Sequence, residues 1–304
     1  MSLYLGIDTS NYTTSVAVCG DTEVNLRKII EVKEGQRGIR QSDGVFLHLK
    51  ELPQLFESMN VDMCDIKAVG VSTKPRNQKG SYMPVFTAGE SFARVIAKAL
   101  GVPLFKTSHQ DGHIMAGITS CKADELLKEE FICVHLSGGT TEILSCRYEN
   151  GSFNPKIIGG TKDISAGQLL DRLGVALGMK FPCGRELDRL SLTANEDISL
   201  KISHDKGFIN FSGMETKLLN MTNKEDSAVL AKSALLFIGK SINAALSFLK
   251  PSKVLFVGGV ASNTILRKMF SHQGYETYFA SCELSSDNAV GISHIAKKLF
   301  EEMI

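Results

Sequence analysis

Two histidines stand four residues apart in the segment 107–113, which reads Thr-Ser-His-Gln-Asp-Gly-His. If Ser108 caps a helix there, His109 and His113 project from the same face, and this spacing lets two imidazoles share one metal ion. The same spacing also suits a hydrogen-bonded or merely exposed pair. A zinc-protease helix carries Glu directly after its first His as general base, whereas Gln110 cannot accept a proton. The segment therefore indicates either a shared metal or a structural pair, and it disfavours a zinc peptidase.

A turn of small residues, Ser137, Gly138 and Gly139, joins two apolar runs, 131–136 and 143–146. Apolar runs around such a turn predict a β-hairpin. Paired glycines let an anionic ligand approach the backbone, and successive N–H groups in a turn form an anion-binding concavity. Many hairpins of this composition bind no ligand. The turn is therefore either a phosphate site or an ordinary connection.

The hairpin plan occurs twice, because residues 4–19 repeat the pattern of residues 131–146 and Ser10 falls on Ser137 at the shared offset. Self-similarity over so long a distance predicts two related lobes, each opening with a hairpin, with a ligand cleft between them. The strands and helices expected around these repeats alternate as in an α/β domain.

A second glycine pair, Gly258 and Gly259, follows a buried apolar strand at 254–257 and precedes a helix whose first turn is 261–263. A helix N-terminus directly after such a strand presents free N–H groups and the positive end of a dipole to a ligand. The segment lacks the Walker lysine and the three-glycine dinucleotide pattern. It is therefore a candidate phosphate site of neither type.

Two acidic residues each have two interpretations. Asp171 lies off the apolar stripe of a helix that starts at Ser165, where a carboxylate either accepts ribose hydroxyls of a nucleotide or lies on a solvated face. Asp287 precedes the last helix, 289–304, either as its N-cap or as a metal ligand.

Three cations, Lys74, Arg76 and Lys79, lie in the segment 74–80, which has no regular period. The segment is either a phosphate-contacting loop or a solvated turn. The formal net charge of +1 supplies no long-range attraction to RNA. Any RNA contact is therefore expected to be local.

Composition limits the protein class. At 304 residues and 43% apolar, the chain can bury a sizeable core and its length suits two domains. Seven scattered cysteines without a Cys-x-x-Cys pair are typical of a reducing cytosol. We find no leader pattern at the N-terminus and no apolar run approaching roughly 18 residues. The sequence predicts a soluble, cytoplasmic protein with no membrane partner.

Taken in their order along the chain, the motifs resemble those of the TsaD family, also called glycoprotease or peptidase M22, within the actin-like ATPase (ASKHA) superfamily. The resemblance covers the chain essentially from end to end. The matching stretches are Gly6-Ile7-Asp8-Thr9-Ser10, His109-x-x-x-His113, Ser137-Gly138-Gly139, Ala166-Gly167 with Asp171, Phe211-Ser212-Gly213, Gly258-Gly259-Val260 with Asn263, and Asp287-Asn288.

The resemblance implies an α/β, duplicated two-lobed fold of mixed sheets flanked by helices, with a nucleotide cleft between the lobes. We expect an N-terminal lobe of residues 1–118, completed by a C-terminal helix at 288–304, and a C-terminal lobe of residues 119–287. The implied activity is a metal-dependent transfer of threonylcarbamoyl from threonylcarbamoyl-AMP to N6 of the adenine after the anticodon in tRNA. TsaB-like and TsaE-like proteins are the implied partners.

The resemblance also implies roles for individual residues. One iron or zinc ion would be held by His109, His113 and Asp287, and Asp8 and Ser10 would be catalytic. Lys74, Arg76 and Lys79 become candidate contacts to tRNA phosphates. ATP, AMP or an acyl-adenylate would be bound by His135, Leu136, Ser137, Gly138, Gly139, Asp171, Gly184, Gly258, Gly259 and Asn263.

The chain departs from the family on the side of the acceptor. Family members usually carry an acidic pair after the first strand, whereas this chain reads Asn11-Tyr12-Thr13. Thr140 replaces a common histidine, and the cationic segment 74–80 replaces a Gly-Pro-Gly loop. A lost general base typically costs about 100-fold to 10,000-fold in rate. Three alternatives follow: a paralogue with another carbamoyl acceptor, a non-catalytic nucleotide-binding subunit and, with less support, a metalloendopeptidase.

Overall fold

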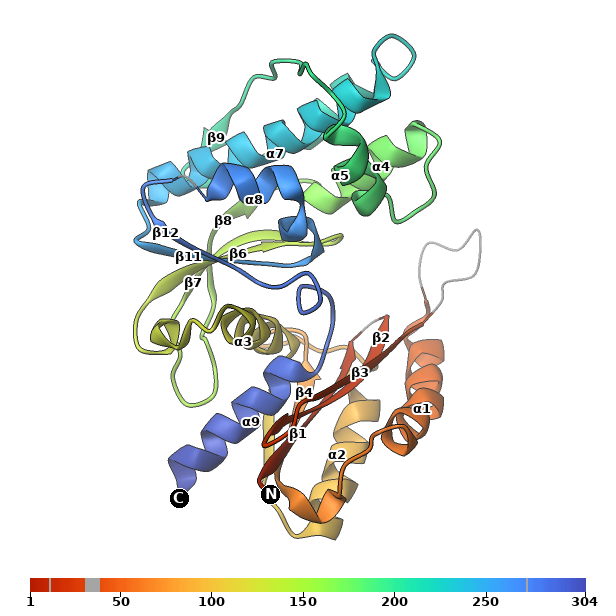
Figure 1. Cartoon of the computed structure of the whole chain (residues 1–304), viewed down its shortest axis with the longest axis vertical. Helices are drawn as coiled ribbons and strands as arrows, with labels where there is room; N and C mark the ends of the chain where they lie inside the picture. Colours follow the sequence, from red (N-terminus) through yellow and green to blue (C-terminus); the bar gives the residue numbers. More distant parts are fainter. Residues whose placement is uncertain (11, 31–38, 272) are drawn as a thin grey trace. The chain divides into compact units, whose positions relative to one another are not determined.

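The computed structural model describes residues 1–10, 12–30, 39–271 and 273–304. The chain forms two compact units, shown with their elements in Figure 1. Unit 1 comprises Met1–Lys128, Arg147–Asn154 and Ser286–Ile304, and unit 2 comprises Glu129–Cys146 and Pro155–Ser285.

The units differ in their limits from the expected lobes, 1–118 with 288–304 and 119–287. Unit 1 extends to Lys128, and it also takes the segment Arg147–Asn154. Asp287, expected in the second lobe, belongs to unit 1.

Unit 1 contains a five-stranded sheet in the order β3-β2-β1-β4-β5. Strands β1, β2 and β3 are antiparallel, while β4 and β5 continue the sheet parallel to β1. The strands are β1 Leu3–Ser10, β2 Thr13–Gly20, β3 Val24–Ile29, β4 Ile66–Lys74 and β5 Leu104–Ser108. The helices of the unit are α1 Gln41–Glu57, α2 Phe86–Leu100, α3 His109–Cys121 and α9 Val290–Met303, with short 3₁₀ turns at Met63–Asp65 and Asp124–Leu127.

Strand β1 is buried on both faces, because side chains alternate across a strand and helices cover both sides. Leu3, Leu5 and Ile7 pack in one core cluster with residues of α1 and α2. On the other face, Gly6 lies against the backbone of α9, where a Cβ would stand 2.5 Å from Ser293 N. A side chain at this position would push α9 off the sheet.

Unit 2 contains a seven-stranded sheet in the order β12-β11-β6-β7-β8-β10-β9. The strands are β6 Phe131–Leu136, β7 Thr141–Cys146, β8 Lys156–Thr161, β9 His204–Asp205, β10 Phe208–Ile209, β11 Lys253–Val257 and β12 Glu276–Phe279. The helices are α4 Ala166–Ala176, α5 Gly184–Ser191, α6 Ser212–Leu219, α7 Ser227–Leu249 and α8 Thr264–Phe270, with a 3₁₀ turn at Gly259–Ser262.

The two sheets share one plan. In unit 1 the hairpin β1–β2 has an antiparallel third strand, β3, on one side and the parallel strands β4 and β5 on the other. In unit 2 the hairpin β6–β7 is flanked in the same way by β8 and by β11 and β12. The predicted repetition of the hairpin at 4–19 and 131–146 is therefore a repetition of the whole five-stranded arrangement.

Helix α7 is the centre of the core of unit 2. Among the described residues it is the one helix whose length and composition would let it cross a membrane. Within its most apolar window, 67% of the residues are buried inside the protein, and they pack with residues of α4, α5 and α8. This burial is typical of the core helix of a soluble domain.

Candidate metal and nucleotide sites

Helix α3 carries the histidine pair, and its first residue is fixed by the predicted cap. Ser108 is the N-cap, and its hydroxyl oxygen accepts a hydrogen bond of 3.1 Å from the Asp111 N–H. His109 is therefore the first residue of the helix, and His113 lies one turn further along the same face.

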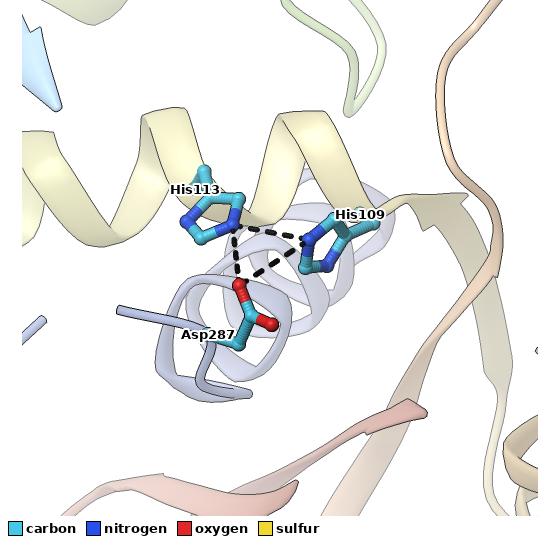
Figure 2. Close-up of side chains that lie close together, drawn as sticks. All are labelled: His109, His113 and Asp287. Carbon is cyan, nitrogen blue, oxygen red and sulfur yellow. Dashed lines mark hydrogen bonds and ion pairs between the residues drawn. The ribbon is translucent and has the colours of Figure 1, made fainter. Parts of the chain in front are cut away.

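The carboxylate of Asp287 completes a group of three with these imidazoles, as Figure 2 shows. The Nε2 atoms of His109 and His113 are 3.1 Å apart. Asp287 Oδ1 lies 3.2 Å from Nε2 of His113 and 3.7 Å from Nε2 of His109. Three potential ligand atoms from two distant parts of the chain thus face one point in unit 1.

These distances fit a first-row divalent ion. Four ligands around zinc at about 2.1 Å in a tetrahedron stand about 3.4 Å from one another, a value between the observed separations. Two histidines and one carboxylate also form the donor set of many non-haem iron(II) sites. Three protein ligands leave at least one position open, as in catalytic rather than structural sites.

Asp8 and Ser10, the two residues expected to be catalytic, contact the ligands themselves. Asp8 Oδ2 lies 3.0 Å from Nδ1 of His109, and its other oxygen accepts a hydrogen bond from the Ser72 hydroxyl. The Ser10 hydroxyl donates to Asp287 Oδ2 at 3.1 Å. Asp8 is 0% exposed, so its carboxylate is placed to fix the orientation and tautomer of the His109 ring.

The charges of the group reinforce one another. Burial lowers the pKa of His109, but the charge and hydrogen bond of Asp8 and the charge of Asp287 outweigh it and raise the pKa to about 9. Burial raises the pKa of Asp287, yet the hydrogen bond from His113 and the positive charges of both histidines hold it well below its usual range. The carboxylates therefore favour a positive charge at this place, as a metal site requires.

The helix-capping alternative for Asp287 is wrong. The Val290 N–H at the start of α9 donates to Asn288 Oδ1 at 2.9 Å. The N-cap of α9 is Ala289, which makes no side-chain capping bond, and the carboxylate of Asp287 faces the histidines instead.

In unit 2, the turn between β6 and β7 is held tightly from one side. Ser137 N–H donates to Thr140 O at 2.8 Å, and the Ser165 hydroxyl at the start of α4 donates to Gly138 O at 2.7 Å. A Cβ on Gly167 would lie 2.4 Å from Gly138 Cα, so only glycine permits this approach. A Cβ on Gly138 or Gly139 would meet nothing within 4 Å, so the turn is open at both glycines.

The second glycine pair lies beside the first strand of the hairpin. Val257 pairs with His135 in the parallel ladder between β11 and β6. Gly258 has a φ of +93°, and a Cβ there would lie 2.3 Å from Leu136 O. Gly259 faces open space. The structure thus brings the end of β6 and the second glycine pair together.

Asp171 and Asn263, which are expected to contact the nucleotide, also make hydrogen bonds that hold the local structure. Asp171 Oδ1 accepts the Cys183 N–H at 2.8 Å and holds the turn before Gly184, the first residue of α5. Burial raises the pKa of Asp171, and this hydrogen bond partly offsets the rise. Asn263 is the N-cap of α8 and accepts the Leu266 N–H at 3.1 Å. Their ligand contacts remain predictions.

The three predicted cations belong to neither group, although Lys74 pairs with Ser108, the residue before His109, in the ladder between β4 and β5. Lys74, Arg76 and Lys79 lie at the end of β4 and in the loop that follows, with Lys79 exposed. Asn11 lies outside the described residues. Sequence reasoning missed Ser72, whose only signal was a hydroxyl near the end of a buried strand.

Residues 48–294 match the family described as TsaD, tRNA N6-adenosine threonylcarbamoyltransferase. The chain belongs to the TsaD family. A tRNA N6-adenosine threonylcarbamoyltransferase from Clostridium kluyveri is 28% identical to it, over 96% of this chain and 91% of the relative.

Solved structures confirm the predicted actin-like fold of this TsaD-family chain. Component A of (R)-2-hydroxyglutaryl-CoA dehydratase from Acidaminococcus fermentans aligns with a TM-score of 0.61 at 15% identity, over 99% of this chain and 100% of that chain. The activator of 2-hydroxyisocaproyl-CoA dehydratase from Clostridium difficile, solved with bound ADPNP, aligns with a TM-score of 0.57 at 16% identity, over 99% and 96%. At these identities the likeness concerns the fold alone.

Proposed function

We propose that this TsaD-family chain is a metal-dependent transferase that moves threonylcarbamoyl from threonylcarbamoyl-AMP to N6 of the adenine after the anticodon in tRNA. The group of His109, His113 and Asp287 carries the proposal, since its three ligand atoms lie within 4.8 Å of one another. Family membership supplies the reaction class.

The metal site suits this chemistry. An iron or zinc ion held by the three side chains would supply a Lewis acid for a carbamoyl carbonyl. Asp8 keeps the Nδ1 side of His109 occupied, so that Nε2 is presented to the ion, and the Ser10 hydroxyl holds one oxygen of Asp287. Both residues act through a ligand in this mechanism and are positioning residues.

The nucleotide is assigned to unit 2. The open glycines of the β6–β7 turn, Gly138 and Gly139, and the pair Gly258 and Gly259 offer backbone N–H groups to the phosphate of ATP, AMP or an acyl-adenylate. Asp171 has one carboxylate oxygen beyond the bond to Cys183 for a ribose hydroxyl. ADPNP bound to the Clostridium difficile activator, which has the same fold, supports a nucleotide here.

The acceptor side supports tRNA less directly. Lys74, Arg76 and Lys79 would contact phosphates of the tRNA. They supply a local positive charge on a chain whose formal net charge is +1. TsaB-like and TsaE-like proteins are the proposed partners, in a cytoplasmic assembly.

A second candidate is a paralogue that uses another carbamoyl acceptor. The family's acidic pair is absent here, and the described part of its replacement, Tyr12 and Thr13, offers no carboxylate. Thr13 is 6% exposed and pairs with Ser10 across the hairpin, so its hydroxyl is a poor substitute for a general base.

Mass spectrometry of tRNA nucleosides from a deletion strain tests the proposal. Complementation with the wild-type chain should restore the threonylcarbamoyl nucleoside, while His109→Ala and His113→Ala should not. Metal analysis of the purified proteins should find about one ion in the wild type and less in the variants. A nucleoside profile unaffected by the deletion would reject the tRNA acceptor and favour the paralogue.

A further inference from the structure

Asp111 lies on α3 between the two metal histidines, and it is 0% exposed. A carboxylate so far from water needs several donors to offset its lost hydration. Locally, Asp111 Oδ2 accepts a hydrogen bond of 2.7 Å from the hydroxyl of the cap Ser108 and one of 3.3 Å from the Thr107 hydroxyl. A residue that only capped the helix would need no contacts beyond these local ones.

The other donors to Asp111 come from distant segments. The Asn77 side-chain amide donates to Asp111 Oδ2 at 2.5 Å, and the Phe153 N–H donates to Oδ1 at 2.9 Å. The Ser152 hydroxyl lies 2.5 Å from the same Asn77 amide. One carboxylate therefore ties the metal helix to the cationic segment 74–80 and to the segment Arg147–Asn154, all within unit 1.

A backbone contact strengthens the tie to the cationic segment. The N–H of Gln110, the residue after the first metal histidine, donates to Pro75 O at 3.0 Å. Pro75 stands between Lys74 and Arg76, and Asn77 follows directly. The segment is thus attached at two neighbouring points to the first turn of α3.

We propose that Asp111 is a positioning residue that fixes the cationic segment 74–80 relative to the metal histidines, so that a phosphate-rich acceptor is held in register with the metal group. The part that concerns the acceptor rests on the proposed function. The mechanical part, a shared anchor for loop and metal helix, rests on the contacts of Asp111 alone.

Asp111→Asn tests the anchor with little change of shape. An amide offers one acceptor oxygen in place of two, so at least one buried donor loses its partner. We expect amide hydrogen exchange in residues 74–82 and at Gln110 to accelerate by about tenfold, and metal affinity to fall by a similar factor, because each lost bond of this kind is equivalent to about one power of ten.

Asn77→Ala removes the side-chain link between the loop and Asp111, together with the bond to Ser152, and leaves the backbone bond from Gln110 to Pro75 in place. Exchange should accelerate in residues 74–82 while metal affinity stays at the wild-type value. With tRNA as acceptor, KM should rise several-fold and kcat should stay unchanged. Ile118→Val serves as a control, since it loosens the buried core beneath the same helix without touching the network.

The outcomes separate this inference from the proposed function. Faster exchange and weaker metal binding in Asp111→Asn beyond those of Ile118→Val support the anchor even if wild-type protein transfers nothing to tRNA. Exchange in residues 74–82 that matches the control in both network variants overturns the anchor, even if the enzyme is active on tRNA. An unchanged tRNA KM in Asn77→Ala overturns the part that concerns the acceptor.

Discussion

The histidines of α3 and the carboxylate of Asp287 can form one group only if α9 packs closely against α3. Adding a single methyl group at the contact between the two helices tests this. Helices α3 and α9 meet at two glycines, and a Cβ on Gly291 would lie 1.9 Å from the backbone oxygen of Gly112. Ordinary contact begins near 3.4 Å, so Gly291→Ala requires the two backbones to separate by about 1.5 Å. The obstacle is a helix backbone, which cannot rotate away as a side chain can.

This displacement is large on the scale of the site. Asp287 stands four residues before Gly291, and α9 sets its distance to the histidines of α3. Metal–ligand distances tolerate only about 0.2 Å. We therefore expect metal affinity to fall by more than about tenfold, in addition to about 1–3 kcal/mol of lost stability from overpacking.

A matched variant separates these two effects. A Cβ on Gly112 would meet the end of the Ile292 side chain at 2.6 Å, and this end can rotate. Gly112→Ala should therefore keep most of its metal affinity, with helix propensity offsetting part of the strain. Isothermal titration with Zn²⁺ or anaerobic Fe²⁺ measures affinity, and the rise in Tm on adding metal gives a second reading. Wild-type metal affinity in Gly291→Ala would refute the reasoning.

Three further variants test other parts of the structure. Asp8→Asn should lower metal affinity by about 10-fold to 100-fold by releasing the His109 ring, measured by the same titration, and wild-type affinity would contradict this. Gly167→Ala should displace Gly138 and weaken binding of a fluorescent ATP analogue several-fold without changing metal affinity, whereas equal nucleotide binding would contradict the assigned turn. Burial lowers the pKa of His48 to about 4, so between pH 6.5 and 4 the unfolded chain binds a proton that the folded chain does not. The free energy of unfolding should therefore decrease by up to about 3 kcal/mol as the pH falls through this range. In urea titrations His48→Asn should lack this part of the decrease, and a decrease parallel to that of the wild type would be evidence against it.

Local rules were sufficient to predict the histidine pair and the duplicated fold. The cap at Ser108 and the spacing of four residues depend only on helix geometry, and both occur as expected. The repetition at 4–19 and 131–146 depends on strand alternation, which one sequence displays, and the sheet order of the two units bears it out.

The role of Asp287 could not be chosen from local rules, because a cap and a metal ligand have the same sequence signature. The contact that places Asp287 beside His113 joins residues more than 170 positions apart and depends on the approach of α9 to α3. For the same reason the sequence did not predict that the segment Arg147–Asn154 belongs to unit 1, since this depends on the long-range hydrogen bond from the Phe153 N–H to Asp111. The resemblance implied a catalytic role for Asp8, but only the fold shows that it lies beside His109.

Glycines at close backbone contacts build both candidate sites. In unit 1, Gly112 and Gly291 lie where α3 and α9 bring the candidate metal ligands together, and in unit 2, Gly167 brings α4 against Gly138. At Gly291 and Gly167 the obstacle is backbone, so these contacts exclude any side chain, whereas the departures from the family include side chains beyond them, such as Thr140. Side chains outside such contacts can change without moving the backbone that forms the site. The framework for a metal and a nucleotide is therefore compatible with more than one acceptor, and this is why the nature of the acceptor has to be tested separately from the two sites.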